Sequence, residues 1–438
     1  MCPVTREMLL RFREEEKTKR EIRVLQAATA KCELQDLAYI PSAAARLNGE
    51  FTLELKTRGI TWQQKSGRCW LYAVMNILRE KAAEKCGLEK FELSGNYLSF
   101  YDKLEKANNV LEMAVLYADK PLNDRMNEYI LEGFHDGGYW DMAVDLVRKY
   151  GAVPQEAMPE TFQSTHTEKF RKLLSSLLRK DVLILRAAVK NGEDPAPLKE
   201  KMLEEVYRME CVAYGEPPAE FDFSWRDRDG VFHEDRRLTG REFYRKYIGE
   251  PLEDYITVTD HPTAGLKKDL HYVFHYIGCM ADRDIVNLNL SADEMEALAL
   301  RQLKDGRPVW FGCDSGAFGD REKGIWDPDS IDYGGLLGGI DFSMSKGDRL
   351  MSHDSYATHA MILVGVHLDE NGKPDRWKIE NSWGPEGVND GYYFCTDTWF
   401  ERFVYQLVIN KKYLKGKLDN IGEVTELAPW DPMGTLAD

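Results

Sequence analysis

The sequence is poor in the features that mark specialised classes of protein. No segment approaches the ~18 uninterrupted apolar residues of a membrane-spanning helix, and the first residues, MCPVTREMLLRFREEE, are charged where a secretion signal is apolar. Glycine and proline, with 34 and 17 of 438 residues, are too few for a collagen-like or low-complexity chain. We therefore expect a globular, soluble protein of the cytoplasm, without a membrane partner.

Positive charge is also in short supply. The chain has 58 Lys and Arg residues against 74 Asp and Glu residues, so its formal net charge is −16. An acidic surface repels a phosphate backbone, and nucleic acid is therefore not an expected partner. The hydrophobic fraction of 43% is nevertheless large enough for a sizeable core.

The eight cysteines are scattered, and no Cys-x-x-Cys pair marks a redox or metal motif. We expect most of them to be reduced thiols, each by default a small buried residue. His271, His275 and Cys279 have a spacing that would bring them to one face of a helix, where they could bind Zn²⁺. Their segment, HYVFHYIGC, is aromatic and β-branched, which favours extended structure or core packing. We therefore predict neither a metal nor a cofactor.

Hydrophobic periodicity divides the chain into an early helical part and a late β part. Helical spacing begins at Cys69 in CWLYAVMNILREKAAEK and recurs up to about residue 214, with charged helices and proline loops in its later portion. The last third contains β-rich runs separated by glycine and asparagine turns, namely HAMILVGVHLDENG, RWKIENSWG and GYYFCTD. Helices that precede strands favour an α+β fold with an antiparallel sheet over a doubly wound sheet.

Cys69 stands where a glycine-containing turn, QQKSGR, leads into the first position of an apolar helix. The helix dipole and the free N–H groups of the first turn stabilise a thiolate there and are expected to lower the thiol pKa. A cysteine at the start of a helix is more often structural than catalytic. A catalytic role for Cys69 therefore depends on partners elsewhere in the chain.

His359 precedes the apolar run AMILVGV, a strand that would hold its imidazole rigidly beside a thiol. A neutral imidazole accepts the thiol proton and returns it to a leaving amine. His353 is the nearest alternative, but it lies in a polar loop. Asn381, in IENSWG, offers an amide oxygen that would fix the tautomer of the imidazole, and Trp383 would shield that bond from water.

Gln63 lies shortly before the candidate nucleophile. Its side-chain amide and the backbone N–H of Cys69 would together bind the oxyanion of an acyl-transfer intermediate. The adjacent Gln64 is an alternative for the same role.

Four motifs follow one another along the chain: Gln63, then CW at Cys69, HA at His359 and NSWG at Asn381. In the presence and order of these motifs the chain resembles the papain superfamily of cysteine peptidases. More narrowly, it is similar to the bleomycin hydrolase and bacterial aminopeptidase C family in SGRCW, DGGYWDM, RKYGAVP, GEPPAEF, VWFGCD, THAM, ENSWG and the closing PWDPMGTLAD. The resemblance implies a papain-like core, with the active site between a helical half and an antiparallel β half. Members of that family also have large helical insertions, which would explain the long stretch of chain between Cys69 and His359.

The same resemblance implies the roles of the site residues. It implies that Cys69 is the nucleophile and that His359 is the general base and acid. Asn381 is implied to orient the imidazole, and Gln63 to donate to the oxyanion. It also places the loop of Asp136, Gly137 and Gly138 along the substrate cleft, where glycine lets a peptide backbone approach. A plain turn before the next helix is an equally good interpretation of that loop.

The end of the chain is also implied to take part. In the family that the chain resembles, the C-terminal arm lies in the active-site cleft, and its terminal carboxylate, here that of Asp438, meets the α-ammonium group of the substrate. Such an arm acts as a steric stop and a charge partner, so peptides with a free N-terminus are cleaved from that end. The run PWDP has a poor composition for a flexible tail, which favours docking. Because the family forms hexameric cages, we also expect a homohexamer.

These expectations divide the chain into an N-terminal arm (1–60), the helical half with the nucleophile (61–160), an insertion with oligomer contacts (161–290), the β-rich half (291–414) and the C-terminal arm (415–438). The leading function is a cysteine aminopeptidase that acts through a thioester acyl-enzyme. Two alternatives stay open. One is a cage-like binding protein with a catalytically weak thiol, and the other is a thiol amidohydrolase of non-peptide amides.

Overall fold

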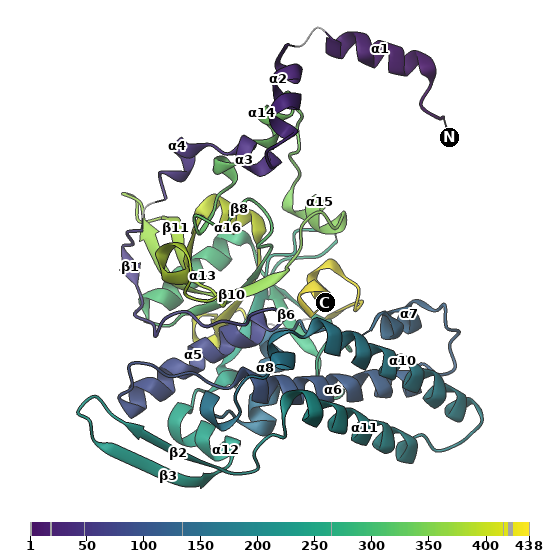
Figure 1. Ribbon diagram of the computed structural model, residues 1–438, viewed down its shortest axis with the longest axis vertical. Coiled ribbons are helices and arrows are strands. Elements are labelled where there is room, and N and C mark those ends of the chain that lie inside the picture. The colour runs from purple at the N-terminus through teal and green to yellow at the C-terminus, as the bar shows by residue number, and fades with distance from the viewer. Residues whose placement is uncertain are drawn as a thin grey trace.

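The computed structural model describes residues 2–17, 20–47, 49–133, 135–263, 265–414, 416–418 and 424–437. Its elements form a helical half and a β half that meet along the middle of the molecule (Figure 1). The α+β class expected from the sequence is confirmed. No helix in these ranges combines the length and the apolar character that a membrane crossing requires.

The helical half is built around α5 (Cys69–Cys86), which is buried over most of its length. This helix ends at Gly87, whose left-handed φ of 66° closes its last turn. The helix predicted to begin at Cys69 is therefore confirmed. The other helices of this half are α6 (Gly95–Leu116), α7 (Arg125–Glu132), α8 (Trp140–Tyr150), α9 (Phe162–Thr165), α10 (Glu168–Lys190), α11 (Ala196–Tyr214) and α12 (Gly240–Phe243).

The β half contains one large sheet with the strand order β14-β5-β6-β4-β13-β7-β10-β11-β12-β9-β8, and β1 pairs with β10. Most neighbours are antiparallel, as expected, but β4 with β6, β5 with β14 and β9 with β12 pair in parallel. The strands are β1 (Leu53–Glu54), β4 (Tyr255–Thr259), β5 (Leu270–Phe274), β6 (Ile285–Asn289), β7 (Val309–Cys313), β8 (Gly319–Asp320), β9 (Ile325–Trp326), β10 (His359–Leu368), β11 (Pro374–Glu380), β12 (Tyr392–Thr396), β13 (Val404–Asn410) and β14 (Thr425–Leu427). A separate hairpin, β2 (Phe221–Arg226) and β3 (Phe232–Leu238), lies beside the helical half (Figure 1).

Strand β10 is covered on both faces. Ala360, Ile362 and Val364 belong to the core that includes α5, whereas Met361 and Leu363 belong to the core that includes α13 (Ala292–Lys304) and α16 (Asp397–Phe403). This burial on two sides explains why the strand reads as a continuous apolar run. It also fixes the backbone of the residue at which the strand begins.

The two ends of the chain lie in different surroundings. At the N-terminus, α1 (Arg6–Lys17) and α2 (Arg20–Thr29) form an arm that projects from the β half, followed by α3 (Leu34–Ala38) and α4 (Pro41–Ala44) (Figure 1). At the C-terminus, the short 3-10 helix η7 (Pro432–Ala437) lies between the two halves (Figure 1). The remaining α-helices, α14 (Tyr333–Leu336) and α15 (Lys346–Met351), lie on the side of the β half.

Candidate active site

Cys69 begins α5 and is only 6% exposed. The turn before it touches the segment around Asp136 so closely that a Cβ atom on Gly67 would lie 2.8 Å from the Cβ of Asp136. Burial raises the pKa of the Cys69 thiol to about 11, although the backbone N–H groups of Ala360, Trp70 and Cys69 itself lower it. The lowered thiol pKa expected from the helix dipole is therefore wrong, because the loss of hydration outweighs the effect of the helix N-terminus.

His359 begins β10 and is 5% exposed. Its Nε2 lies 2.8 Å from the Oδ1 of Asn381. An amide oxygen only accepts hydrogen bonds, so the neutral imidazole carries its proton on Nε2 and leaves Nδ1 as the free base. Burial lowers the pKa of His359 to about 4, an effect that the hydrogen bond to Asn381 partly offsets. The ring is therefore neutral at physiological pH, as a general base requires.

Packing of α5 against β10 brings the candidate nucleophile and base to one interface. The backbone N–H of Ala360, which follows His359 in the strand, lies close enough to the sulfur of Cys69 to lower its pKa. The neighbouring strand β7 adds a second tie, because the indole N–H of Trp310 donates to the carbonyl of Trp70 at 3.2 Å. His353, by contrast, is exposed in the loop before β10.

Asn381 is held in place by its own neighbour, because its Oδ1 also accepts the backbone N–H of Ser382 at 2.7 Å. The ring of Trp383 stacks on that of His359 with a centroid distance of 4.8 Å, in the position expected of a shield. Arg321 is an unexpected member of the site. Its guanidinium carbon lies 4.3 Å from the centroid of the Trp383 ring, and its charge helps to lower the pKa of His359. It lies in the turn between β8 and β9, and no sequence pattern marks it.

Gln63 is buried and bonded to the segment that carries the orienting amide. The Oγ of Ser382 donates to the Oε1 of Gln63 at 2.6 Å, and the backbone N–H of Gln63 donates to the carbonyl of Ser382 at 2.9 Å. The amide nitrogen of Gln63 donates to the carbonyl of Ser66, in the turn that leads to Cys69. An amide nitrogen has two N–H donors, so a second one is left for an oxyanion. Gln64 is exposed and lines a cavity that Asp136 and Gly137 also border.

The side chain of Asp136 is engaged within the helical half. Its Oδ1 lies 2.9 Å from the Nζ of Lys103, which is itself fully buried. Burial alone would raise the pKa of Asp136, but the charge of Lys103 and hydrogen bonds from Thr167 and Lys103 hold it well below its usual range. The backbone carbonyl of Asp136 accepts the indole N–H of Trp70 at 2.8 Å. The residue therefore anchors its loop against the start of α5.

A cavity of about 410 Å³ lies beside this loop, and both Asp136 and Gly137 border it together with the turn at 64–67. Gly138 is packed on the indole of Trp70, from which a Cβ atom at this position would be 2.6 Å away. Close packing therefore explains the glycine at position 138, whereas Asp136 and Gly137 lie next to open space near the candidate nucleophile.

The C-terminal arm docks between the two halves. The carbonyl of Met433 accepts hydrogen bonds from the Nε2 of Gln406 at 3.3 Å and the hydroxyl of Tyr139 at 3.4 Å. Leu436 is buried, and its Cδ2 would lie 3.2 Å from a Cβ atom on Gly312, the residue of β7 that pairs with Ala360. The arm thus reaches the neighbourhood of the candidate base. Asp438 lies outside the described residues.

The residues with metal-ligand spacing do not share a helix face. His271 is buried in β5, and His275 follows that strand with its Nδ1 2.8 Å from the Oδ1 of Asp284. The thiol of Cys279 is buried 3.8 Å from the carbonyl of Met142. The extended structure favoured by the composition of this segment is confirmed, and the helical arrangement is not formed.

Comparison with known proteins points to one family. The sequence model of the Peptidase C1-like family matches residues 3–434. Over 418 residues the chain is 41% identical to Aminopeptidase C from Listeria innocua, and the alignment covers 94% of each protein. It is also 40% identical over 405 residues to Aminopeptidase C from Lactobacillus delbrueckii subsp. lactis, with 89% of each covered. The crystal structure of PepW from Lactobacillus rhamnosis superposes with a TM-score of 0.96 at 38% identity, over 99% of each chain.

Proposed function

The chain belongs to the Peptidase C1-like family, and from this premise we propose that it is a cysteine aminopeptidase, which removes N-terminal residues from peptides through a thioester acyl-enzyme. The relatives named Aminopeptidase C support this activity. The observation that carries the proposal is the 2.8 Å contact between the Nε2 of His359 and the Oδ1 of Asn381. It leaves Nδ1 unprotonated at the interface that holds Cys69, and a free base beside a thiol is what acyl transfer needs.

In the acylation step, Nδ1 of His359 takes the thiol proton while the sulfur of Cys69 attacks the scissile carbonyl carbon. The amide N–H of Gln63 and the backbone N–H of Cys69 bind the oxyanion of the tetrahedral intermediate. The imidazolium, stabilised by Asn381, then donates its proton to the leaving nitrogen, and the C–N bond breaks. The same imidazole deprotonates a water molecule, which hydrolyses the thioester and restores the thiol.

We attribute the selection of free N-termini to the C-terminal arm. Leu436 packs beside β7, so the last residues start from the neighbourhood of the reacting groups. The terminal carboxylate of Asp438 would pair with the α-ammonium group of the substrate, and charge-assisted bonds of this kind are strong where water is excluded. Asp136 and Gly137 would line the cleft, and Gly138 would support them by its packing on Trp70.

The aminopeptidase activity is tested with fluorogenic aminoacyl amides that carry either a free or an acetylated N-terminus, in the presence of a reductant. The wild-type protein should hydrolyse only the free amines, with a burst of released fluorophore before steady turnover. The Cys69→Ser variant should fold normally and hydrolyse none. A wild-type protein that reacts with a small chloromethyl ketone but hydrolyses nothing would indicate a binding cage. Preference for non-peptide amides would indicate an amidohydrolase.

We further propose that the enzyme is a cytoplasmic homohexamer that does not bind nucleic acid. Leu9, Leu10 and Phe12 are exposed on the projecting arm, where a second copy of the chain would cover them (Figure 1). All eight cysteines are free thiols, in keeping with a reducing compartment, and the net charge of −16 disfavours a phosphate backbone. Sedimentation equilibrium should give the mass of a hexamer for the full chain and a smaller assembly after deletion of residues 2–17. Equal masses would contradict a role for the arm.

A further inference from the structure

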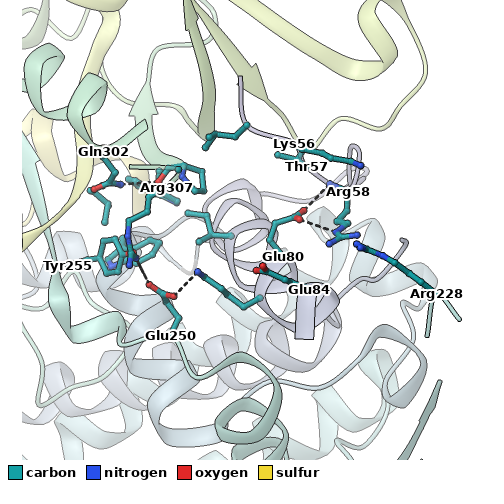
Figure 2. A pocket seen from close by; sticks show the side chains of 18 residues that line it. Lys56, Thr57, Arg58, Glu80, Glu84, Arg228, Glu250, Tyr255, Gln302 and Arg307 are labelled. Carbon is teal, nitrogen blue, oxygen red and sulfur yellow. Dashed lines mark hydrogen bonds and ion pairs between the residues drawn. The ribbon is translucent and has the colours of Figure 1, made fainter. Parts of the chain in front are cut away.

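A second cavity opens along the C-terminal half of α5 (Figure 2). Its volume is about 380 Å³, and small-molecule sites span roughly 300–1,000 Å³. The residues of α5 that line it include Ile77, Glu80 and Glu84. At ~1.5 Å per residue, they lie roughly 12 to 22 Å along the helix from Cys69. This cavity is therefore separate from the candidate active site.

The deep part of the cavity is apolar. Trp310, Val408 and Trp140 line it and are almost fully buried, and Leu55 and Ile77 extend the same surface. An apolar ligand body would thus meet an apolar wall.

Two arginines at opposite ends of the cavity are each held by an acid (Figure 2). The Nε of Arg58 donates to Glu80 at 3.1 Å, and the Nη1 of Arg307 donates to Glu250 at 3.0 Å and to the hydroxyl of Tyr255 at 2.8 Å. In the described part of the chain, the Nη2 of neither arginine has a hydrogen-bond partner. Because a guanidinium has five N–H donors in a fixed plane, both keep donors for a ligand while their orientation is already set.

The lining is basic although the protein is acidic. Five cationic side chains face three carboxylates here, against a net charge of −16 for the chain. Two of the carboxylates, Glu80 and Glu250, are in ion pairs. At the end of the cavity that holds Arg58, the view also shows Arg228 and Lys56, and within the described ranges neither has an acidic partner (Figure 2). A negatively charged ligand group would therefore be attracted to this end.

We propose that this cavity is a binding site for an organic carboxylate with an apolar body. The apolar body lies against Trp310 and Val408, and the carboxylate meets the basic end formed by Arg58, Arg228 and Lys56. Two sources share this chemistry, namely a short acyl chain and the C-terminal end of an apolar peptide. A peptide would also offer carbonyl oxygens to the free N–H groups of Arg307.

Titration calorimetry on the intact protein tests the sign of the charge, with octanoate and octylamine as probes of equal length. Octanoate should bind at least about tenfold more tightly than octylamine, the factor expected from one charge-assisted hydrogen bond. Glu84→Gln should tighten the binding of octanoate, because it removes a repelling carboxylate, and Arg228→Gln should weaken it. Both side chains are exposed and have no partner in the described residues, so the folds of these variants should be unaffected.

Arg236→Gln is the matched control, because Arg236 lies on the same hairpin but outside the cavity. It should leave the affinity for octanoate unchanged. Acetyl-leucyl-leucine distinguishes a peptide C-terminus from an acyl chain as the source of the carboxylate. If this dipeptide binds more tightly than octanoate and Arg228→Gln weakens its binding as well, the ligand is a peptide. Weaker binding identifies an acyl chain. Octylamine binding as tightly as octanoate, or an octanoate affinity that neither Glu84→Gln nor Arg228→Gln changes, would overturn the proposal.

Discussion

The guanidinium of Arg79 and the carboxylate of Glu380 form an ion pair 2.8 Å long that is buried between the helical half and the β half, with 2% and 1% of the two side chains exposed. Arg79 belongs to the helix that begins at Cys69, and Glu380 is the last residue of β11, directly before Asn381. The pair therefore couples the helix of the candidate nucleophile to the amide that orients the candidate base.

Glu380→Gln should destabilise the protein, because it leaves the buried charge of Arg79 with only the longer contact of its Nε to Glu80, at 3.7 Å. Removal of one partner of a buried pair costs about 3–5 kcal/mol. Burial, partly offset by Arg79, raises the pKa of Glu380 from its ordinary 4.5 to about 7, so between these values the folded chain holds a proton that the unfolded chain has lost, and the stability of the wild type should fall as the pH rises. The variant has no such group, so its loss of stability relative to the wild type should be smaller above pH 7 than below pH 4.5. Urea unfolding measures the effect. Glu168→Gln, which breaks the exposed pair with Lys172, is the control and should leave the midpoint unchanged.

His359 should make the stability of the protein depend on pH in the acid range. Its pKa of about 4 in the folded state lies below the ordinary value of 6.5, so between these values the unfolded chain binds a proton that the folded chain does not. This contribution rises with pH and is about 3 kcal/mol smaller at pH 4 than above pH 6.5, at ~1.4 kcal/mol per pKa unit. His359→Gln should remove that part of the slope when unfolding midpoints are plotted against pH. An identical slope in the variant would contradict the assignment.

The reactivity of Cys69 should follow its raised pKa. Only the thiolate is alkylated, so inactivation by iodoacetamide should accelerate about tenfold per pH unit until the pH nears the thiol pKa of about 11. Loss of activity is the readout, which separates Cys69 from the exposed Cys2 and Cys32. A rate that is already constant near neutral pH would show that the resting site holds a thiolate and an imidazolium instead.

Gln63→Ala should lower kcat roughly 10²–10³-fold, the usual effect of losing one oxyanion donor, with little change in KM. Gln64→Ala is the matched control for kcat, because Gln64 has the same side chain at the next position but is exposed; since it borders the same cavity as Asp136 and Gly137, any effect should be on KM. It should retain wild-type kcat. Equal losses in the two variants would mean that the effect comes from distortion of the turn.

Deletion of residues 436–438 should weaken the cleavage of free aminoacyl amides and permit the cleavage of N-acetylated ones. The reason is that the deletion removes both the steric stop and the terminal charge. Addition of two glycines after Asp438 should have a similar effect, because it displaces the carboxylate but keeps the packing of Leu436. Selectivity that is unchanged in both variants would show that the arm has no part in it.

Local patterns were sufficient for the parts of the fold that depend on local physics. The start of α5 at Cys69 and the strand after His359 follow from apolar spacing and turn residues. The short strands β4 and β6 were not marked by the sequence, because β6 pairs with β4, and β4 in turn depends on β13, far along the chain. The ion pair of Lys103 with Asp136 and the stacking of Arg321 on Trp383 were missed for the same reason. The sequence predicted a lowered pKa for the Cys69 thiol, whereas its pKa is raised, and the cause is related: the burial that raises it is a property of the whole fold.

Cys69 is the first residue of a helix and His359 is the first residue of a strand, and both elements are enclosed by packed side chains. Neither the candidate nucleophile nor the candidate base is therefore carried by a loop, and the segments between them do not set the distance across which a proton would be passed. Insertions and replacements in those segments can change which peptides are admitted while the turnover step itself stays the same. In such an architecture, the range of accepted peptides can change between relatives while the chemical reaction stays the same.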